Sequence, residues 1–523
     1  MRTKKLLLNS IFAAFSQAIV LITGMILPQI FISVYGSEIN GMVSSILQFI
    51  SYITLIESGL GVAAVYALYK PLVEKDYKGI NEIIYSAKIY YFKTATIFSI
   101  LIIILSIFYP FFIHSEALPY SEILLLVLVL GSGGAIEFIT MAKYRVLLTA
   151  DQRIYVLSIA AIIGTLVNFS ITYCLYTLNI NIILVKFISL VSYFIRSYFL
   201  SAYVKKNYPL VSYKKNSKKI IVINNRMNAL FLQLSSITSI SIPTIAVTVT
   251  CTLKQVSVFS VYNMIFSGIM SIITIFTTGM SATFGQIYAE NNKSLFNNRY
   301  NQFEFVLYNI ITVLYACAII LIMPFIAIYT INLTDTQYYF PQLGYLFVIW
   351  GVTYCIKIPQ NTVISASGKF KETKIINKIQ LLLFLTLPFI GGRKIGIDGV
   401  LISMILINIL HYFYLICFIS KNVLPNCARS SLFRLCRMIL IIFIFNYLLN
   451  DKLSFYIIDF YTWFILATII FVIITICVFL VAYIFEPKIS RYLFEIIVNV
   501  FKNSIYRFQK IIKINWDLMK RGE

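Results

Sequence analysis

The sequence predicts an all-helical membrane protein that crosses a bilayer about fourteen times. Its composition is 60% hydrophobic and 12% charged, with 2 histidines in 523 residues, which is far from a soluble enzyme of this length. Its apolar stretches are each roughly 20 to 28 residues long, which suits an α-helix that crosses about 30 Å of hydrocarbon. Of the 43 Lys and Arg residues, 36 fall in every second gap between these stretches.

The basic gaps predict the orientation of the chain. Because cytoplasmic loops carry an excess of Lys and Arg, both termini and every basic gap are assigned to the cytoplasm. The net charge of +23 is then a result of topology, and the partner it favours is the anionic membrane surface rather than nucleic acid. The basic gaps are Arg2–Lys5, Lys70–Lys93, Lys143–Arg153, Lys205–Arg226, Lys293–Arg299, Lys369–Lys378, Lys421–Arg437 and Lys488–Arg521.

The opposite gaps are short. The first apolar run, Leu6 to about Val34, is too long for the core of a cleaved signal peptide, so it is expected to stay as the first transmembrane helix. None of the outer gaps has room for a large catalytic domain, which disfavours an outward-facing glycosyltransferase or polymerase. These gaps are Tyr35–Asn40, His114–Tyr120, Asn179–Asn181, Cys251–Gln255, Tyr329–Tyr339, Gly391–Asp398 and Asn450–Phe460.

The chain also carries an internal duplication. A shift of about 213 to 220 residues lays Glu57–Leu60 over Thr277–Met280 and Tyr144–Arg153 over Asn361–Phe370. Two halves of six helices have the same orientation, so they imply a pseudo-twofold axis along the membrane normal. The predicted parts are an N-lobe (1–204), a basic linker (205–220), a C-lobe (221–420), two extra helices within 421–485 (about Arg437–Leu449 and Tyr461–Phe485) and an amphipathic basic tail (486–523) on the cytoplasmic leaflet.

Four short motifs stand out in the first half of the chain: Tyr35-Gly36 followed by Gly41, Glu57–Gly61, Tyr69–Leu72 and Leu147–Arg153. With the six-plus-six helices and two extra, they resemble the polysaccharide-transporter branch of the multidrug/oligosaccharidyl-lipid/polysaccharide exporter superfamily, which includes the Wzx-type flippases. Many members carry Arg near the inner end of the second helix, where this chain has Tyr66.

The resemblance implies a transporter rather than an enzyme. Its cargo would be a polyprenyl-pyrophosphate-linked oligosaccharide, such as an O-antigen, capsule or exopolysaccharide repeat unit. Alternating access between two lobes would carry the cargo from the inner to the outer leaflet of a bacterial cytoplasmic membrane. A glycan polymerase or another biosynthetic membrane protein is an expected interaction partner.

Cations inside the predicted spans are the first candidate site. An ionisable residue at the bilayer centre costs about 2.5 to 3.5 kcal/mol on insertion scales, so it needs a partner or a wet cavity. Arg196, Lys357 and Lys186 could form a cationic cavity for a phosphate-linked cargo. Alternatively, the first two neutralise acids, and Lys186 extends to the outer headgroups. Arg145 and Arg226 join this set, but they lie nearer the cytoplasm and can also reach headgroups.

The acids and the flexible points form the second candidate set. Glu57, Glu137 and His411 are the candidates for sensing a coupling ion, with structural pairing or packing as the alternative. Small residues beside Glu57 and prolines inside spans can let helices bend. The hinge candidates are Gly59, Gly61, Pro28 and Pro243.

No cofactor or metal is expected. The eight cysteines form no CxxC pair, so neither a disulfide framework nor a zinc site is supported. The chain lacks GxxxxGK[ST], so ATP is not the predicted energy source. The predicted energy source is the membrane potential, with a proton or sodium gradient as the alternative. Two other functions stay open: a cation-coupled multidrug exporter with a more acidic cavity, and a membrane-embedded glycosyl or acyl transferase.

Overall fold

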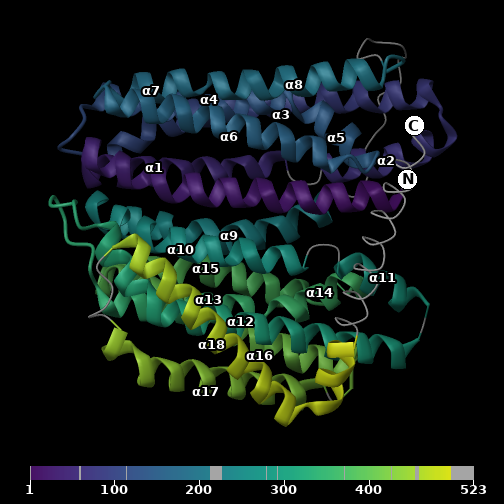
Figure 1. Ribbon diagram of the computed structural model, residues 1–523. Coiled ribbons are helices and arrows are strands. Elements are labelled where there is room, and N and C mark those ends of the chain that lie inside the picture. Colours follow the sequence, from purple (N-terminus) through teal and green to yellow (C-terminus); the bar gives the residue numbers. More distant parts are fainter. Residues whose placement is uncertain are drawn as a thin grey trace, which may run out of the picture. The chain divides into compact units, whose positions relative to one another are not determined.

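The computed structural model describes residues 2–57, 60–113, 115–211, 226–277, 280–290, 292–369, 372–425, 427–453 and 459–495. Over this part of the chain the structure is helical and contains no strand (Figure 1). Eleven of its helices are long and apolar enough to cross a membrane. The protein is therefore an all-helical membrane protein, as predicted.

The first helix, α1 (Arg2–Ile53), contains two spans rather than one. Its 52 residues would extend about 78 Å as a single helix, far more than the roughly 30 Å of hydrocarbon in a bilayer. Gly36 interrupts it with φ 83° and ψ 168°, a backbone conformation that glycine adopts without steric cost. The 3₁₀ turn η1 (Thr54–Glu57) and helix α2 (Leu60–Glu74) continue the second span.

The described helices fit the predicted fourteen spans when four consecutive pairs are each counted as one span. These pairs are α4–α5, α7–α8, α10–α11 and α13–α14. In chain order the helices are α3 (Tyr77–Phe112), α4 (Tyr120–Thr140), α5 (Ala142–Ala150), α6 (Ile154–Thr177), α7 (Ile182–Ser189), α8 (Val191–Asn207), α9 (Arg226–Thr250), α10 (Leu253–Thr277), α11 (Met280–Ala289), α12 (Lys293–Tyr329), α13 (Pro341–Cys355), α14 (Ile358–Ser367), α15 (Lys374–Ile395), α16 (Ile397–Asn422), α17 (Cys427–Leu453) and α18 (Phe460–Phe485).

The ends of α5 and α14 agree with the internal duplication. Asp151 follows the last residue of α5 and Gly368 follows the last residue of α14, and the shift that reveals the duplication lays one over the other. These two ends fit two repeats. The superposition of the repeats and the lobe boundaries stay predictions.

The chain divides into two compact units. The first contains Met1–Ile275, Ile326–Gly351 and Lys371–His411. Within it α3 packs on α4 and α1 packs on α6, and small residues allow the close approach: a Cβ added to Gly131 would lie 2.4 Å from Ile102 Cγ2. The second contains Phe276–Phe325, Val352–Phe370 and Tyr412–Glu523, and there α11 packs on α14.

One predicted loop is wrong. The sequence placed Arg434 and Arg437 in a basic cytoplasmic gap, with a helix starting near Arg437. In the structure α17 already begins at Cys427, so both arginines lie inside a helix and are buried. The predicted linker beyond Val211 and the amphipathic tail beyond Glu495 lie outside the described residues.

Candidate functional site

The strongest polar cluster inside the spans of the first unit gathers around Arg145 on α5. Its guanidinium forms an ion pair with Glu57 at the end of η1, and its second terminal nitrogen lies 3.4 Å from Glu137 Oε1 on α4. We call Arg145, Glu57 and Glu137 the Arg145 site. It joins both predicted coupling acids to one predicted cargo cation, and the cation that bridges them is Arg145 rather than Arg196 or Lys357.

A tyrosine borders the Arg145 site. Tyr91 on α3 is 2% exposed, and a Cβ added to Gly61 on α2 would lie 3.0 Å from its hydroxyl oxygen and 3.9 Å from Glu57 Oε1. A side chain at position 61 would therefore press on both groups. Gly61 leaves room for them, which is a packing reason for the glycine beside its predicted hinge role.

The Arg145 site is accessible rather than buried. The exposed fractions of its side chains are 39% for Arg145, 21% for Glu57 and 30% for Glu137. Charged groups in a membrane span persist where they pair and where they face a water-filled cavity. The Arg145 site therefore pairs its charges within the spans and leaves all three side chains partly exposed.

Two of the other predicted cations contact aromatic rings. Arg196 on α8 packs its chain against Gly164, where an added Cβ would lie 2.1 Å from Arg196 Cδ, and its guanidinium stacks over the Tyr193 ring. Lys186 on α7 donates a hydrogen bond of 3.2 Å to the Tyr176 hydroxyl and lies over the Phe31 ring. Both lie in aromatic or close-packed surroundings and make no ion pair that the structure describes.

Lys357 and His411 are buried, with exposed fractions of 4% and 5%. Lys357 lies at the break between α13 and α14 and its ammonium is 5.2 Å from the centre of the Tyr354 ring. His411 lies within α16. In this conformation neither side chain is open to solvent.

The remaining candidates are the hinge residues and Arg226. Pro28 and Pro243 lie inside α1 and α9, as predicted. The hinge role stays a prediction for both. Arg226 is the first residue of α9, and its side chain, like all of Gly59, is outside the described part of the structure.

A second polar cluster of the first unit lies at the predicted outer end of the spans. Asp335 accepts hydrogen bonds from the Ser37 amide (2.6 Å) and hydroxyl (2.8 Å). The Tyr338 hydroxyl bonds to the hydroxyls of both Ser37 and Ser257, and Asn40 donates to Ser257 at 2.7 Å. We call these five residues the outer seal.

A close backbone contact adjoins the outer seal. A Cβ added to Gly41 on α1 would lie 1.9 Å from the Leu253 carbonyl oxygen on α10, which is far inside van der Waals contact. The two helices can approach this closely because residue 41 has no side chain. Gly41 belongs to the motif on which the sequence resemblance rests.

A third cluster lies at the predicted cytoplasmic end. Asp151, directly after α5, pairs with Lys5 at 3.1 Å and with Arg153 at 2.8 Å, and accepts a hydrogen bond from the Tyr208 hydroxyl. Burial raises the pKa of the Tyr208 phenol, and the bond to Asp151 raises it further. This cluster ties the start of α1 and the end of α8 to the α5–α6 turn.

Comparisons with known proteins identify the fold. Among solved structures, an inward-facing multidrug resistance MATE family transporter of the MOP superfamily is similar at 15% identity and TM-score 0.63, covering 82% of this chain and 99% of that chain. Lipid II flippase MurJ, in an inward closed conformation, is similar at 16% identity and TM-score 0.63, covering 91% of this chain and 99% of that one. No protein-family model and no curated protein sequence matches the chain.

The chain has the fold of the MOP exporter superfamily. An outward-facing MATE transporter of the same superfamily is also similar, at 17% identity and TM-score 0.56, with 80% of this chain and 96% of that chain covered. The fold predicted from the sequence is therefore confirmed.

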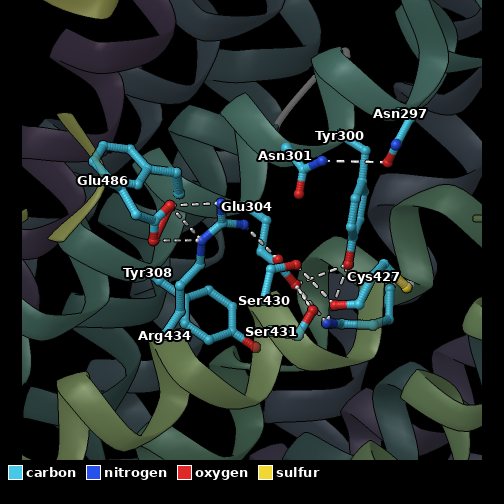
Figure 2. Close-up of polar contacts among 12 residues, drawn as sticks. Asn297, Tyr300, Asn301, Glu304, Tyr308, Cys427, Ser430, Ser431, Arg434 and Glu486 are labelled. Carbon is cyan, nitrogen blue, oxygen red and sulfur yellow. Dashed lines mark hydrogen bonds and ion pairs between the residues drawn. The ribbon is translucent and has the colours of Figure 1, made fainter. Parts of the chain in front are cut away.

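The second unit holds a buried network that the sequence did not reveal (Figure 2). Arg434 on α17 pairs with Glu304 on α12 at 2.7 Å and with Glu486, after α18, at 2.8 Å. We call these three residues the Arg434 network. Their side chains are 2%, 0% and 15% exposed. Further contacts to Glu304 come from Tyr300, Gln360 and Ser431, and Arg437 contacts Glu486.

Proposed function

We propose that the protein is a flippase that moves a lipid-linked oligosaccharide with a phosphate-bearing headgroup across the membrane. The observation that carries this proposal is the Arg145 site: a guanidinium inside the spans, bonded to two acids, with all three side chains partly exposed. A guanidinium offers a planar fork that matches phosphate oxygens. A phosphate can therefore replace one or both carboxylates as the partner of Arg145.

The similarity to known exporters supports this cargo class over a drug. Lipid II flippase MurJ matches 91% of the chain, and the inward-facing MATE transporter matches 82%. The chain also has α17 and α18 beyond its predicted two-times-six repeat. A lipid-linked cargo would give α17 and α18 a role beside the lipid tail, because the tail must stay in the bilayer while the headgroup crosses.

In the proposed mechanism, binding at the Arg145 site is linked to opening at the outer seal. The hydrogen bonds of Ser37, Asp335 and Tyr338 hold the predicted outer end closed, so cargo would enter from the cytoplasmic leaflet. Exchange of a carboxylate for phosphate frees Glu57 at the end of η1. Release requires the seal to break. The protein would work in a bacterial cytoplasmic membrane with both termini inside.

Gly41 offers a direct test of the seal. We expect Gly41→Val to force α1 from α10, because its Cβ would meet the Leu253 carbonyl at 1.9 Å. Labelling of Ser257→Cys, a buried position, by a membrane-impermeant thiol reagent should then rise several-fold. Gly24→Val is the matched control on the same helix, since its added Cβ meets nothing within 4 Å. Unchanged labelling in Gly41→Val would exclude this contact from the seal.

Reconstituted transport tests the function itself. Purified protein in liposomes should move a fluorescent polyprenyl-pyrophosphate oligosaccharide to the opposite leaflet, and Arg145→Ala should slow this by about tenfold or more, the effect of one lost charge-assisted hydrogen bond. Lys70→Ala is the control, because Lys70 is 83% exposed and pairs only with Glu74 in the part of the chain described. Chemical turnover of the lipid-linked sugar would instead indicate a transferase.

A cation-coupled multidrug exporter is the second candidate, and one observation favours it. The Arg145 site holds two carboxylates and one guanidinium, so it carries a net negative charge that suits a cation or proton. Export of cationic dyes by the same liposomes, lost in Glu57→Gln and insensitive to Arg145→Ala, would select this function over the flippase.

A further inference from the structure

We propose that a groove on the second unit binds an anionic phospholipid of the cytoplasmic leaflet, with its phosphate on Arg299 and one acyl chain along α12. The groove is separate from the Arg145 site, which belongs to the first unit. The inference concerns a lipid of the membrane itself and does not depend on the cargo.

The groove has the size and lining of a hydrocarbon site. Its volume is about 540 Å³, which is within the range of about 300 to 1,000 Å³ of small-molecule sites. Helices α10, α11 and α12 form its walls with side chains such as Phe276, Phe284, Phe303 and Ile310, and Leu493 closes one edge. A polar ligand would find almost no partner along these walls.

One cation lies at the groove. Arg299 on α12 donates to Gln302 Oε1 at 3.1 Å and to the Tyr492 hydroxyl at 3.3 Å. Both partners are neutral, and Arg299 forms no ion pair with any residue that the structure describes. Arg145 and Arg434, by contrast, are each bonded to two carboxylates. The charge of Arg299 is thus available to an anion.

The length of the groove matches one leaflet. Arg299 and Ile310 are eleven residues apart on α12, a rise of about 16 Å at 1.5 Å per residue. Half of a hydrocarbon core of about 30 Å is about 15 Å. Arg299 falls in a basic gap that is predicted to be cytoplasmic, so the groove runs from the inner headgroups to the midplane. Basic pockets between spans on this side are where anionic headgroups bind.

Native mass spectrometry of the purified full chain can test this site. The probes are phosphatidylglycerol and phosphatidylcholine with identical acyl chains. We expect the wild type to retain phosphatidylglycerol preferentially, and Arg299→Gln to lose that preference by about tenfold, the effect of one charge-assisted hydrogen bond. Arg299→Lys should keep part of it. Lys70→Gln, the control at an exposed cytoplasmic lysine, should behave as the wild type.

A second variant tests the chain site independently. Thr283 lines the groove and is exposed, so Thr283→Trp should fill the hollow and reduce retention of both lipids. Equal retention of phosphatidylglycerol by the wild type and Arg299→Gln would overturn the headgroup assignment. Unchanged retention in Thr283→Trp would overturn the chain assignment. Displacement of phosphatidylglycerol by polyprenyl phosphate at lower concentration would make the groove a cargo site and overturn the proposal.

Discussion

The Arg145 site and the Arg434 network have the same composition, one arginine between two glutamates, and opposite surroundings. In the Arg145 site the three side chains are 21% to 39% exposed. In the Arg434 network they are 0% to 15% exposed, and Glu304 also accepts from Tyr300, Gln360 and Ser431. The first arginine is thus partly exposed in its pair. The second holds α12, α17 and the end of α18 together.

The largest effect is expected from removing the buried arginine. Arg434→Ala leaves Glu304 charged and buried, and the loss of one partner of a buried ion pair costs about 3 to 5 kcal/mol. We expect a matching fall in the free energy of unfolding, measured by denaturant titration in detergent micelles. Arg429→Ala is the control on the same helix, because Arg429 is exposed. Equal free energies of unfolding for Arg434→Ala and Arg429→Ala would mean that burial does not distinguish the Arg434 network from the Arg145 site.

The equivalent change in the Arg145 site should alter stability less. A partly exposed ion pair costs less to break than a buried one, so Arg145→Ala should lower the free energy of unfolding by less than Arg434→Ala does while it slows transport. The same titration measures the first quantity. A loss as large as that in Arg434→Ala would make the Arg145 site structural and remove the contrast.

A smaller effect is expected from Glu57→Gln. A pyrophosphate headgroup with about two negative charges gains about 4.6 kcal/mol on moving outward at 100 mV, at roughly 2.3 kcal/mol per charge. The potential alone can then drive export, and Glu57→Gln should slow transport without abolishing it. Liposomes with a potassium-diffusion potential and no pH gradient provide the measurement. Transport that needs a proton or sodium gradient and vanishes in the variant contradicts this energy source.

The smallest effect is expected from Glu137→Gln. Its contact with Arg145 is 3.4 Å long, the longer of the two pairs, so the amide should disturb the arginine less than Glu57→Gln does. Initial rates of the two variants in the same liposomes decide the order. A larger effect in Glu137→Gln would mean that Glu137, rather than Glu57, is the acid that leaves Arg145 during transport.

The contrast also shows what the sequence could predict. Hydrophobic length and the placement of Lys and Arg are properties of single segments, so they predicted the fold and the spans. The same reasoning assigned Arg434 to topology, because it falls in the basic gap Lys421–Arg437. Its partners Glu304 and Glu486 are 130 and 52 residues away in the chain. Such long-range pairing has no signature in local composition.

The sequence predicted the members of the Arg145 site but not their grouping. Glu57, Glu137 and Arg145 were all candidates because ionisable residues are rare inside spans. Their grouping depends on where η1, α4 and α5 meet. The sequence analysis offered Arg196 and Lys357 as partners of the acids, as one of two alternatives. The start of α5 after Met141 sets the position of Arg145, and no periodicity predicts which turn faces which.

The single-residue turn at Gly36 constrains how the chain enters the membrane during synthesis. Two spans of α1 meet at one residue, so we expect the pair to insert together as a hairpin. A side chain at position 36 would be strained at φ 83° and would lie 3.3 Å from Asp335 Oδ2. Substitution there should consequently act during biogenesis, as lost insertion and degradation by quality-control proteases, before any transport cycle begins.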